Sequence, residues 1–185
     1  MKKIIISSIV ISALLTAPGA YAADVFTVRP KDSSVTFKVS QMGIALVRGQ
    51  FKKFSGTITF GGGQLTKFEG IVDMTTLATG IAARDKDLKS KNFFATDQFP
   101  VMRIESGPIT QNGRKVTVKS ALTIRNVTKT VELVGTVARD AAPDRKTELM
   151  LKGNIDRKDF GLRLNKIFEF FVGNQVGINL KLVGT

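Results

Sequence analysis

The sequence predicts an all-β protein made of one antiparallel sheet that folds into a sandwich or closes into a barrel. Three observations support this. Apolar and polar residues alternate through most of the chain, short turn motifs separate the alternating runs, and a single segment has a helical pattern. Closure into a barrel removes the unpaired edges that such a long sheet would otherwise expose.

Each alternating run predicts a strand with one apolar and one polar face. In the first run, Val35, Phe37 and Val39 alternate with polar neighbours. The runs cover residues 35–39, 54–60, 68–74, 116–124, 131–137, 149–155 and 176–182. Turn motifs occur at residues 61–63, 111–113, 125–126, 142–144 and 173–174. Short connections between one-sided strands indicate an antiparallel meander.

Two segments break the alternation. Residues 81–92 predict a short helix, which Gly80 precedes and Phe93-Phe94 follows. Residues 167–172 gather three phenylalanines around one glutamate. This second segment predicts either a strand or a flap that packs over an opening.

The N-terminal residues 1–22 have the pattern of a signal peptide. Two lysines precede an apolar stretch, and Ala20-Tyr21-Ala22 has the small-x-small pattern of a cleavage site. We expect cleavage after Ala22, a periplasmic location, and one domain over residues 23–185. The chain has no cysteine, so no disulfide can stabilise that domain.

Composition narrows the function. The chain has neither histidine nor cysteine, which excludes a Ser-His-Asp triad and the usual ligands of zinc, haem and iron–sulfur clusters. We therefore expect no enzyme activity, no catalytic residue, no metal and no cofactor. Arg84-Asp85 and Arg157-x-Asp159 are interpreted as structural pairs, while an enzyme that acts on a lipid or glycan through Asp85 or Asp159 is an open alternative.

The chain is strongly basic, with a net charge of +13. In an exported protein this charge favours an anionic membrane surface or an acidic polysaccharide over nucleic acid. A surface that is merely solvated fits the charge equally well. Nothing in the sequence decides between a monomer and a homodimer.

The apolar faces predict what lines the interior. Four of them carry a glycine in place of a large residue, at Gly56, Gly70, Gly135 and Gly153. These glycines either let the sheet curl or leave part of the lumen unfilled. The predicted ligand-binding lining consists of Phe37, Phe54, Met74, Met102, Leu122, Phe160, Phe168 and Phe171.

Six motifs, in order along the chain, together resemble the YceI-like family of bacterial periplasmic proteins, which have an extended lipocalin-like barrel. The motifs are Ser34–Val39, Gly49–Phe51 with Phe54–Ile58, Thr79–Gly80 with Arg84–Ser90 and Phe93-Phe94, Phe99–Met102, Leu122–Lys129, and Ile155–Gly161. With this resemblance, the strand pattern predicts an antiparallel eight-stranded lipocalin-like β-barrel with one short helix near residues 81–92.

The resemblance implies a lumen that holds a long isoprenoid, a quinone tail or another amphiphile. The family often has histidine where this chain has Ser33, Gln41 and Asp87, so any role of those histidines does not carry over. The leading hypothesis is a periplasmic carrier of an apolar lipid. The alternative is a periplasmic interaction protein with a filled barrel and a cationic face that binds a partner or a membrane.

Overall fold

The computed structural model describes residues 23–41, 45–139, 146–164 and 166–185, without the side chains of residues 45 and 166–168. The predicted signal peptide and the turn predicted at 142–144 lie outside these residues. The described strands are β1 (Asp24–Thr27), β2 (Ser34–Gln41), β3 (Ala45–Phe51), β4 (Phe54–Gly61), β5 (Gln64–Asp73), β6 (Leu77–Ala78), β7 (Val101–Asn112), β8 (Lys115–Ile124), β9 (Val127–Arg139), β10 (Thr147–Asp156) and β11 (Val172–Gly184).

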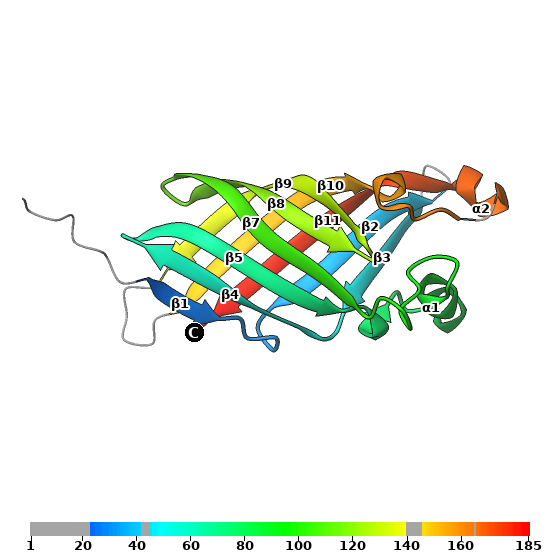
Figure 1. Cartoon of the computed structure of the whole chain (residues 1–185), viewed down its shortest axis with the longest axis horizontal. Coiled ribbons are helices and arrows are strands. Elements are labelled where there is room, and N and C mark those ends of the chain that lie inside the picture. The colour runs from blue at the N-terminus through cyan, green and yellow to red at the C-terminus, as the bar shows by residue number, and fades with distance from the viewer. Residues whose placement is uncertain (1–22, 42–44, 140–145, 165) are drawn as a thin grey trace, which may run out of the picture.

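These strands form one curled sheet, and every pairing in it is antiparallel, which confirms the predicted all-β class (Figure 1). The sheet has 11 strands in the order β1-β4-β5-β7-β8-β9-β10-β11-β2-β3-β6, not the eight we predicted. The short strands β1 and β6 have too few residues to show an alternating pattern, and the sequence around Arg48 and Gly49 in β3 interrupts one.

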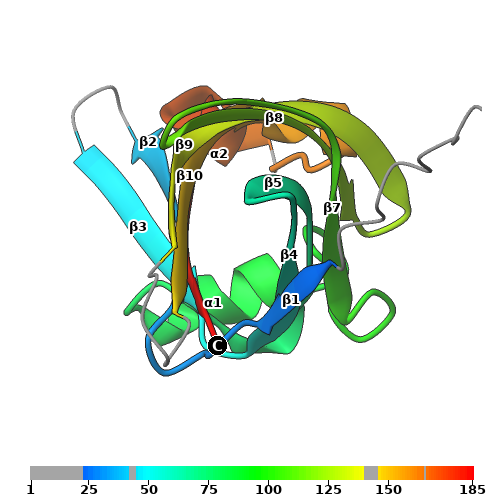
Figure 2. The same ribbon diagram turned by 90° about the vertical axis from the view of Figure 1, so that its left-hand side faces the viewer.

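Eight of the strands nevertheless make a ring. Val28, directly after β1, forms an antiparallel bridge with Gly184 at the end of β11. Backbone hydrogen bonds between Thr27 and Thr185 reinforce it, at 3.0 and 3.1 Å. The bridge joins the first and eighth strands of the sheet order, while β2, β3 and β6 continue beyond β11. Figure 2 looks onto this ring from the end that carries β1 and the C-terminus.

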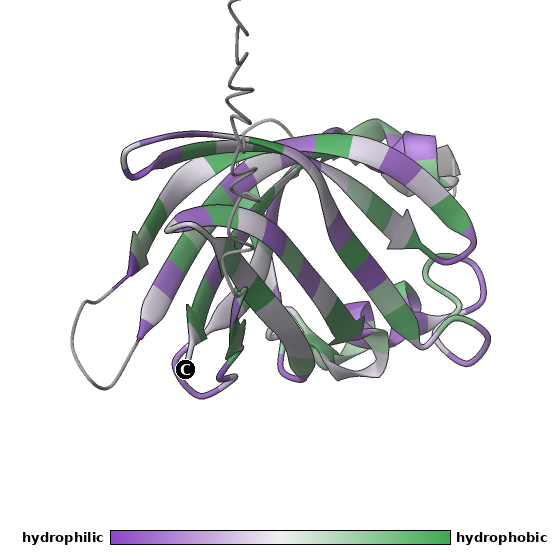
Figure 3. Cartoon of the chain, turned by 60° about the vertical axis from the view of Figure 1, so that its left-hand side comes forward, coloured by the Kyte–Doolittle hydropathy of each residue, from purple (hydrophilic) through white to green (hydrophobic). Residues whose placement is uncertain are grey.

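The alternating faces of the strands are visible as bands of hydrophobic and hydrophilic residues in Figure 3. The turns predicted at residues 61–63, 111–113 and 125–126 lie between β4 and β5, β7 and β8, and β8 and β9. The turn predicted at Gly173-Asn174 was wrong. These residues belong to β11, where the register with β2 shifts between Val172 and Val176, so the local signal marks a bulge.

Two helices lie at the end opposite β1 (Figure 1). α1 (Ala82–Lys89) falls within the helix predicted at residues 81–92. α2 (Lys166–Phe171) occupies the segment for which we predicted a strand or a flap. Two short 3-10 turns follow β5 and β10, at Met74–Thr76 and Arg157–Phe160. No helix in the described part of the chain is long and apolar enough to cross a membrane.

We call the end with the Val28–Gly184 bridge the closed end and the end with α1 and α2 the open end. Tightly packed side chains fill the closed end, including Ile58, Phe68 and Leu133, none of which has measurable solvent exposure. The Arg139 guanidinium lies 5.5 and 5.3 Å from the ring centres of Phe26 and Phe60 and pairs with Asp24 at 2.6 Å. The closed end is therefore solid and capped by a cation.

Candidate functional site: an apolar cavity at the open end

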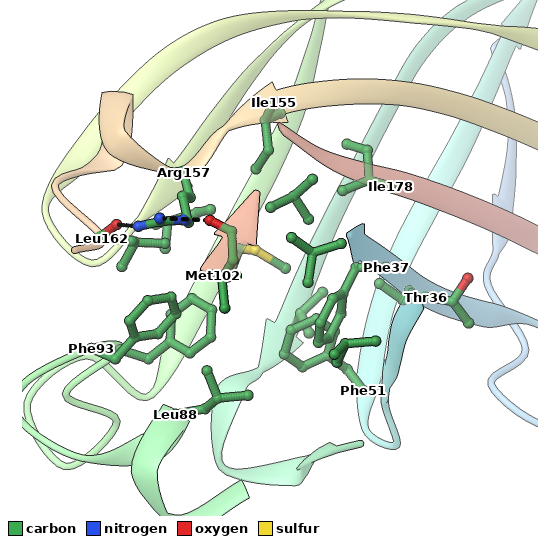
Figure 4. Close-up of a pocket in the computed structure, with 18 of the residues that line it drawn as sticks. Thr36, Phe37, Phe51, Leu88, Phe93, Met102, Ile155, Arg157, Leu162 and Ile178 are labelled. Atoms are coloured by element: carbon green, nitrogen blue, oxygen red, sulfur yellow. Dashed lines mark hydrogen bonds between the residues drawn. The ribbon is translucent and has the colours of Figure 1, made fainter. Parts of the chain in front are cut away.

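A cavity of about 550 Å³ occupies the open end of the barrel (Figure 4). Its wall combines side chains from the strands, from α1 and from the loops beside it. The apolar part of the wall contains Val35, Phe37, Val39, Val47, Phe51, Val72, Leu88, Phe93, Phe94, Met102, Ile104, Leu122, Ile124, Ile155, Leu162, Leu164, Val172, Val176, Ile178 and Leu180. The exposed residues Asp87, Asn92 and Arg163 also line it, so the cavity reaches the surface at this end.

The strands run from the solid core into the cavity wall without changing their pattern. On the inward face of β11, Leu182 is buried, whereas Leu180 and Ile178 are only partly buried. On β2, Val35 is buried, whereas Phe37 is only partly buried. Inward apolar side chains near the open end thus lack partners across the barrel, and the space left between the walls is the cavity.

Three of the eight predicted lining residues lie in the wall: Phe37 on β2, Met102 on β7 and Leu122 on β8. Their part in ligand binding is still a prediction. Phe54, Met74 and Phe160 lie elsewhere. Met74 and Phe160 are buried in the hydrophobic core, and Phe54 packs against that core.

The remaining two predicted residues are on α2. Phe171 borders a separate, shallower depression outside the cavity, together with Ser40 and Phe170. The side chain of Phe168 is outside the described residues. Strand parity shows that a side chain points inward, but parity does not show whether the space opposite is filled.

Sequence reasoning missed much of the wall, including Phe51, Leu88, Phe93, Ile155 and Ile178. Ile155 and Ile178 lie in alternating runs that we had identified, so their inward direction was available. Phe93 was noted as the boundary of the predicted helix and as part of a motif, but not as a lining residue. Leu88 was assigned to that helix, but α1 carries no fully buried residue and its sequence does not indicate which side faces a cavity.

The inward glycines do not create this cavity, since none of them lines it. A Cβ at Gly56, Gly135 or Gly153 would overlap a backbone carbonyl oxygen of the neighbouring strand, from Glu69, Met150 or Glu132 respectively. At Gly70 the nearest atom would be Ile104 Cγ2, at 3.3 Å. These glycines let neighbouring strands of the curled sheet approach each other closely. The interpretation that they leave part of the lumen unfilled was wrong.

A buried arginine, Arg157, holds α2 to the barrel at the open end. Arg157 is only 2% exposed and donates hydrogen bonds to the carbonyl oxygens of Leu162, Gly173 and Val172, at 2.9, 3.2 and 3.3 Å. Figure 4 shows the bond to Leu162. It also pairs with Glu169 of α2, at 3.0 Å. A buried guanidinium needs this full set of acceptors, so Arg157 holds the loop after β10, α2 and the start of β11 together.

Glu169 completes this anchor. Its carboxylate pairs with Lys158 at 3.0 Å and accepts a hydrogen bond from the Leu164 backbone N–H at 3.0 Å. Lys158, Arg157 and that N–H together lower the pKa of Glu169 to about 2. The carboxylate is therefore ionised at any pH near neutrality, and α2 is tied to the barrel by charge.

A second network of hydrogen bonds holds α1 at the open end. The Asp85 carboxylate accepts hydrogen bonds from both the N–H and the hydroxyl of Thr79. Arg84 donates to the Thr79 hydroxyl at 2.8 Å and to its carbonyl at 3.0 Å. Both charged residues thus fix α1 to the end of β6, which supports their structural interpretation. Among the described residues, no group of three or more acidic side chains is placed to hold a metal ion.

The three positions at which the resemblance implies histidine, Ser33, Gln41 and Asp87, do not all lie in the same place. Gln41 and Asp87 line the cavity. Ser33 lies outside it, where its hydroxyl donates to the Val183 carbonyl at 3.4 Å and accepts from the Val183 N–H at 2.9 Å. Two of these three positions therefore lie in the wall of the cavity.

Comparison with known proteins agrees with this architecture. A UPF0312 protein of Photorhabdus laumondii is 30% identical over 172 residues, which is 88% of each chain. The protein YceI of Shigella flexneri is 28% identical over 169 residues, also 88% of each chain.

Two solved structures share the fold. Burkholderia cenocepacia BcnA superposes with a TM-score of 0.77 at 25% identity, covering 85% of this chain and 99% of that one. A polyisoprenoid binding domain from Saccharophagus degradans, implicated in plant cell wall breakdown, superposes with a TM-score of 0.66 at 16% identity, covering 89% and 98%. The YceI-like domain model matches residues 26–184, and the chain therefore belongs to the YceI-like family.

Proposed function

We propose that this protein is a periplasmic carrier that holds a long apolar lipid, isoprenoid-like, quinone-like or another amphiphile, in the cavity and performs no chemistry on it. The observation that carries the proposal is the cavity itself, a hollow of about 550 Å³ with a mainly apolar wall inside an otherwise solid barrel. Its size falls within the range typical of small-molecule sites. The similarity in shape to the polyisoprenoid binding domain of Saccharophagus degradans supports the same class of ligand.

Apolar burial supplies the affinity. Each Å² of apolar surface removed from water contributes roughly 25 cal/mol, so an alkyl or prenyl chain can bind without polar contacts. The closed end is filled, so a chain longer than the cavity must extend through the open end. Its polar head would then lie near Gln41, Asp87 and Arg163, where the wall is polar.

The alternative of a filled barrel accounts less well for the wall. In a filled barrel, Ile178 and Leu180 would be buried as fully as Leu182 is on the same strand. Catalysis on a bound lipid through Asp85 or Asp159 is also disfavoured, since neither residue lines the cavity.

The test is native mass spectrometry of the mature protein, purified from its own host without detergent and followed by organic extraction. We expect a bound mass in the isoprenoid or amphiphile range. N-terminal sequencing of the same sample, taken from a periplasmic fraction, should begin at Ala23 if the predicted signal peptide is cleaved. A clean apo mass, with no uptake of added polyprenyl compounds, would overturn the carrier function.

Two neighbouring variants sharpen this test. Ile178→Trp places a large side chain into the cavity, whereas Asn179→Trp adds the same group on the exposed face of β11. We expect Ile178→Trp to lower lipid occupancy severalfold while circular dichroism shows an intact sheet, and Asn179→Trp to leave occupancy unchanged. Equal occupancy in both folded variants would show that the lipid binds elsewhere.

A further inference from the structure

The open end carries a surface that combines exposed aromatic and basic residues. Phe170 on α2 is 88% exposed and Phe171 is 39% exposed, and their rings contact each other edge to face at 5.5 Å between centres. Among the described residues, these are the only aromatic side chains with such exposure. Large aromatic groups in water are unfavourable, so two together on one short helix need a reason.

The tip of the β2–β3 hairpin extends this surface. Ser40 of β2 borders the same shallow depression as Phe170 and Phe171. Across the ladder Ser40 pairs with Leu46, which is 50% exposed. Figure 1 shows β2 ending beside α2. The apolar part of the surface therefore continues from the helix onto the hairpin.

Two cations follow directly behind the apolar residues. Lys38 and Arg48 are direct cross-strand partners, and both are exposed on the outer face of the hairpin. Neither side chain forms an ion pair with a described residue. Like charges directly opposite each other destabilise a sheet, and an external anion would remove that cost. Glu169, the acidic residue of α2, is already neutralised by Arg157 and Lys158.

We propose that this rim, formed by Leu46, Phe170, Phe171, Lys38 and Arg48, docks the protein onto an anionic phospholipid bilayer. The aromatic pair enters the interfacial region, where amphipathic and aromatic groups are favoured, and the two cations meet the lipid head groups. Gln41 and Val172 pair with each other directly beside Ser40 and Phe171, and both line the cavity. Val172 also borders the depression of Phe170 and Phe171. Docking thus brings this side of the cavity wall, at the open end, against the membrane. The inference extends the proposed function, since it states where a lipid would enter or leave.

The chain contains no tryptophan, so one introduced tryptophan reports its own surroundings. We would compare Phe170→Trp on the rim with Val25→Trp, which replaces a residue that is 61% exposed at the closed end. With phosphatidylglycerol vesicles at low salt, we expect the emission of Phe170→Trp to shift to the blue and that of Val25→Trp to stay unchanged. With phosphatidylcholine vesicles, or in high salt, the response of Phe170→Trp should largely disappear.

Cosedimentation with the same vesicles then separates the contribution of the two cations from that of the aromatic pair. The double variant Lys38→Gln/Arg48→Gln should bind phosphatidylglycerol vesicles on the order of tenfold more weakly. Phe170→Ser/Phe171→Ser should also weaken binding, whereas Val25→Ser should not. Identical emission shifts at the two ends, or vesicle binding that neither double variant reduces, would overturn the proposal. Occupancy of the cavity, measured separately with added polyprenyl compounds, should be unchanged in all these variants, so the docking and carrier proposals can fail independently.

Discussion

The closed and open ends of the barrel are made largely from the same strands but differ in how their inward side chains pack. At the closed end, side chains from opposite walls meet, and Arg139 covers the last pair of rings. At the open end, the same inward positions face a cavity, and two charged networks hold the surrounding helices. Stability is therefore concentrated at one end, which leaves the other free to keep an unfilled apolar surface.

We expect the largest loss of stability where a side chain is added between two strands that lie too close together to accommodate it. In Gly135→Ala the new Cβ would overlap the Met150 carbonyl oxygen, which belongs to the backbone of β10 and cannot rotate away. We expect the free energy of unfolding to fall by about 3 kcal/mol or more, measured by urea denaturation followed by circular dichroism. Gly70→Ala is the matched control, since the nearest atom to its Cβ would be a side-chain methyl of Ile104, at 3.3 Å, and the nearest backbone atom, the Ser55 carbonyl oxygen, would lie at an ordinary contact distance of 3.5 Å. Similar losses at both positions would contradict the role of close strand approach.

A second comparison uses one residue type at both ends. Leu133 is fully buried in the closed end, whereas Leu180 lines the cavity. Leu133→Ala creates a new cavity and should cost about 2–5 kcal/mol of unfolding free energy. Leu180→Ala enlarges an existing one and should cost about 1 kcal/mol, because fewer packing contacts are lost. If the two apo proteins lose equal stability in urea titrations, the open end is as well packed as the closed end.

This contrast explains what could be predicted from the sequence. The alternation through residues 176–182 gives the inward direction of Ile178, Leu180 and Leu182 alike, because parity is a local property. Only the positions of the opposite walls decide that Leu182 is buried and Ile178 faces a cavity. Fold class and α1 were therefore predictable, whereas Met74 and Phe160 were wrongly placed beside Phe37 in one lining.

Long-range partners were equally hidden. Arg157 stood next to Asp159 in the sequence pattern, but it binds Glu169, 12 residues away, together with three carbonyl groups. Arg84 and Asp85, in contrast, act through Thr79 only a few residues away, and their structural interpretation agrees with the observed hydrogen bonds. A charged residue can be interpreted from its sequence neighbours when it binds a nearby part of the chain, as Arg84 and Asp85 do, but not when its partner is distant, as for Arg157.

The Glu169 anchor gives a smaller and pH-dependent effect. Because the folded-state pKa of Glu169 is about 2, below its ordinary value of 4.5, its stabilising contribution is present above about pH 4.5 and is lost as the pH falls toward 2. At pH 7, Glu169→Gln should lower stability by about 1–2 kcal/mol, since Arg157 keeps only carbonyl partners. The difference between wild type and variant should shrink steadily from pH 5 to pH 3.

Local opening of the anchor can be followed by hydrogen exchange at the Leu164 N–H, which donates to Glu169. We expect faster exchange of this amide in Glu169→Gln at pH 7, with unchanged exchange at the closed end, for example at Leu149. A stability difference that stays constant with pH would show that the carboxylate charge does not contribute.

The smallest expected effect concerns the shape of the cavity. Gly49 lies opposite Phe37 in the β2–β3 ladder, and a Cβ there would overlap the far edge of the Phe37 ring. A ring can turn, whereas the carbonyl at Gly135 cannot, so Gly49→Ala should fold with a loss of only about 1 kcal/mol. The displaced ring would move into the cavity and favour shorter or thinner lipids, which competition between polyprenyl compounds of different length would reveal by native mass spectrometry. Unchanged length preference in the folded variant would mean that Phe37, although it lies in the wall, does not set the size of the ligand.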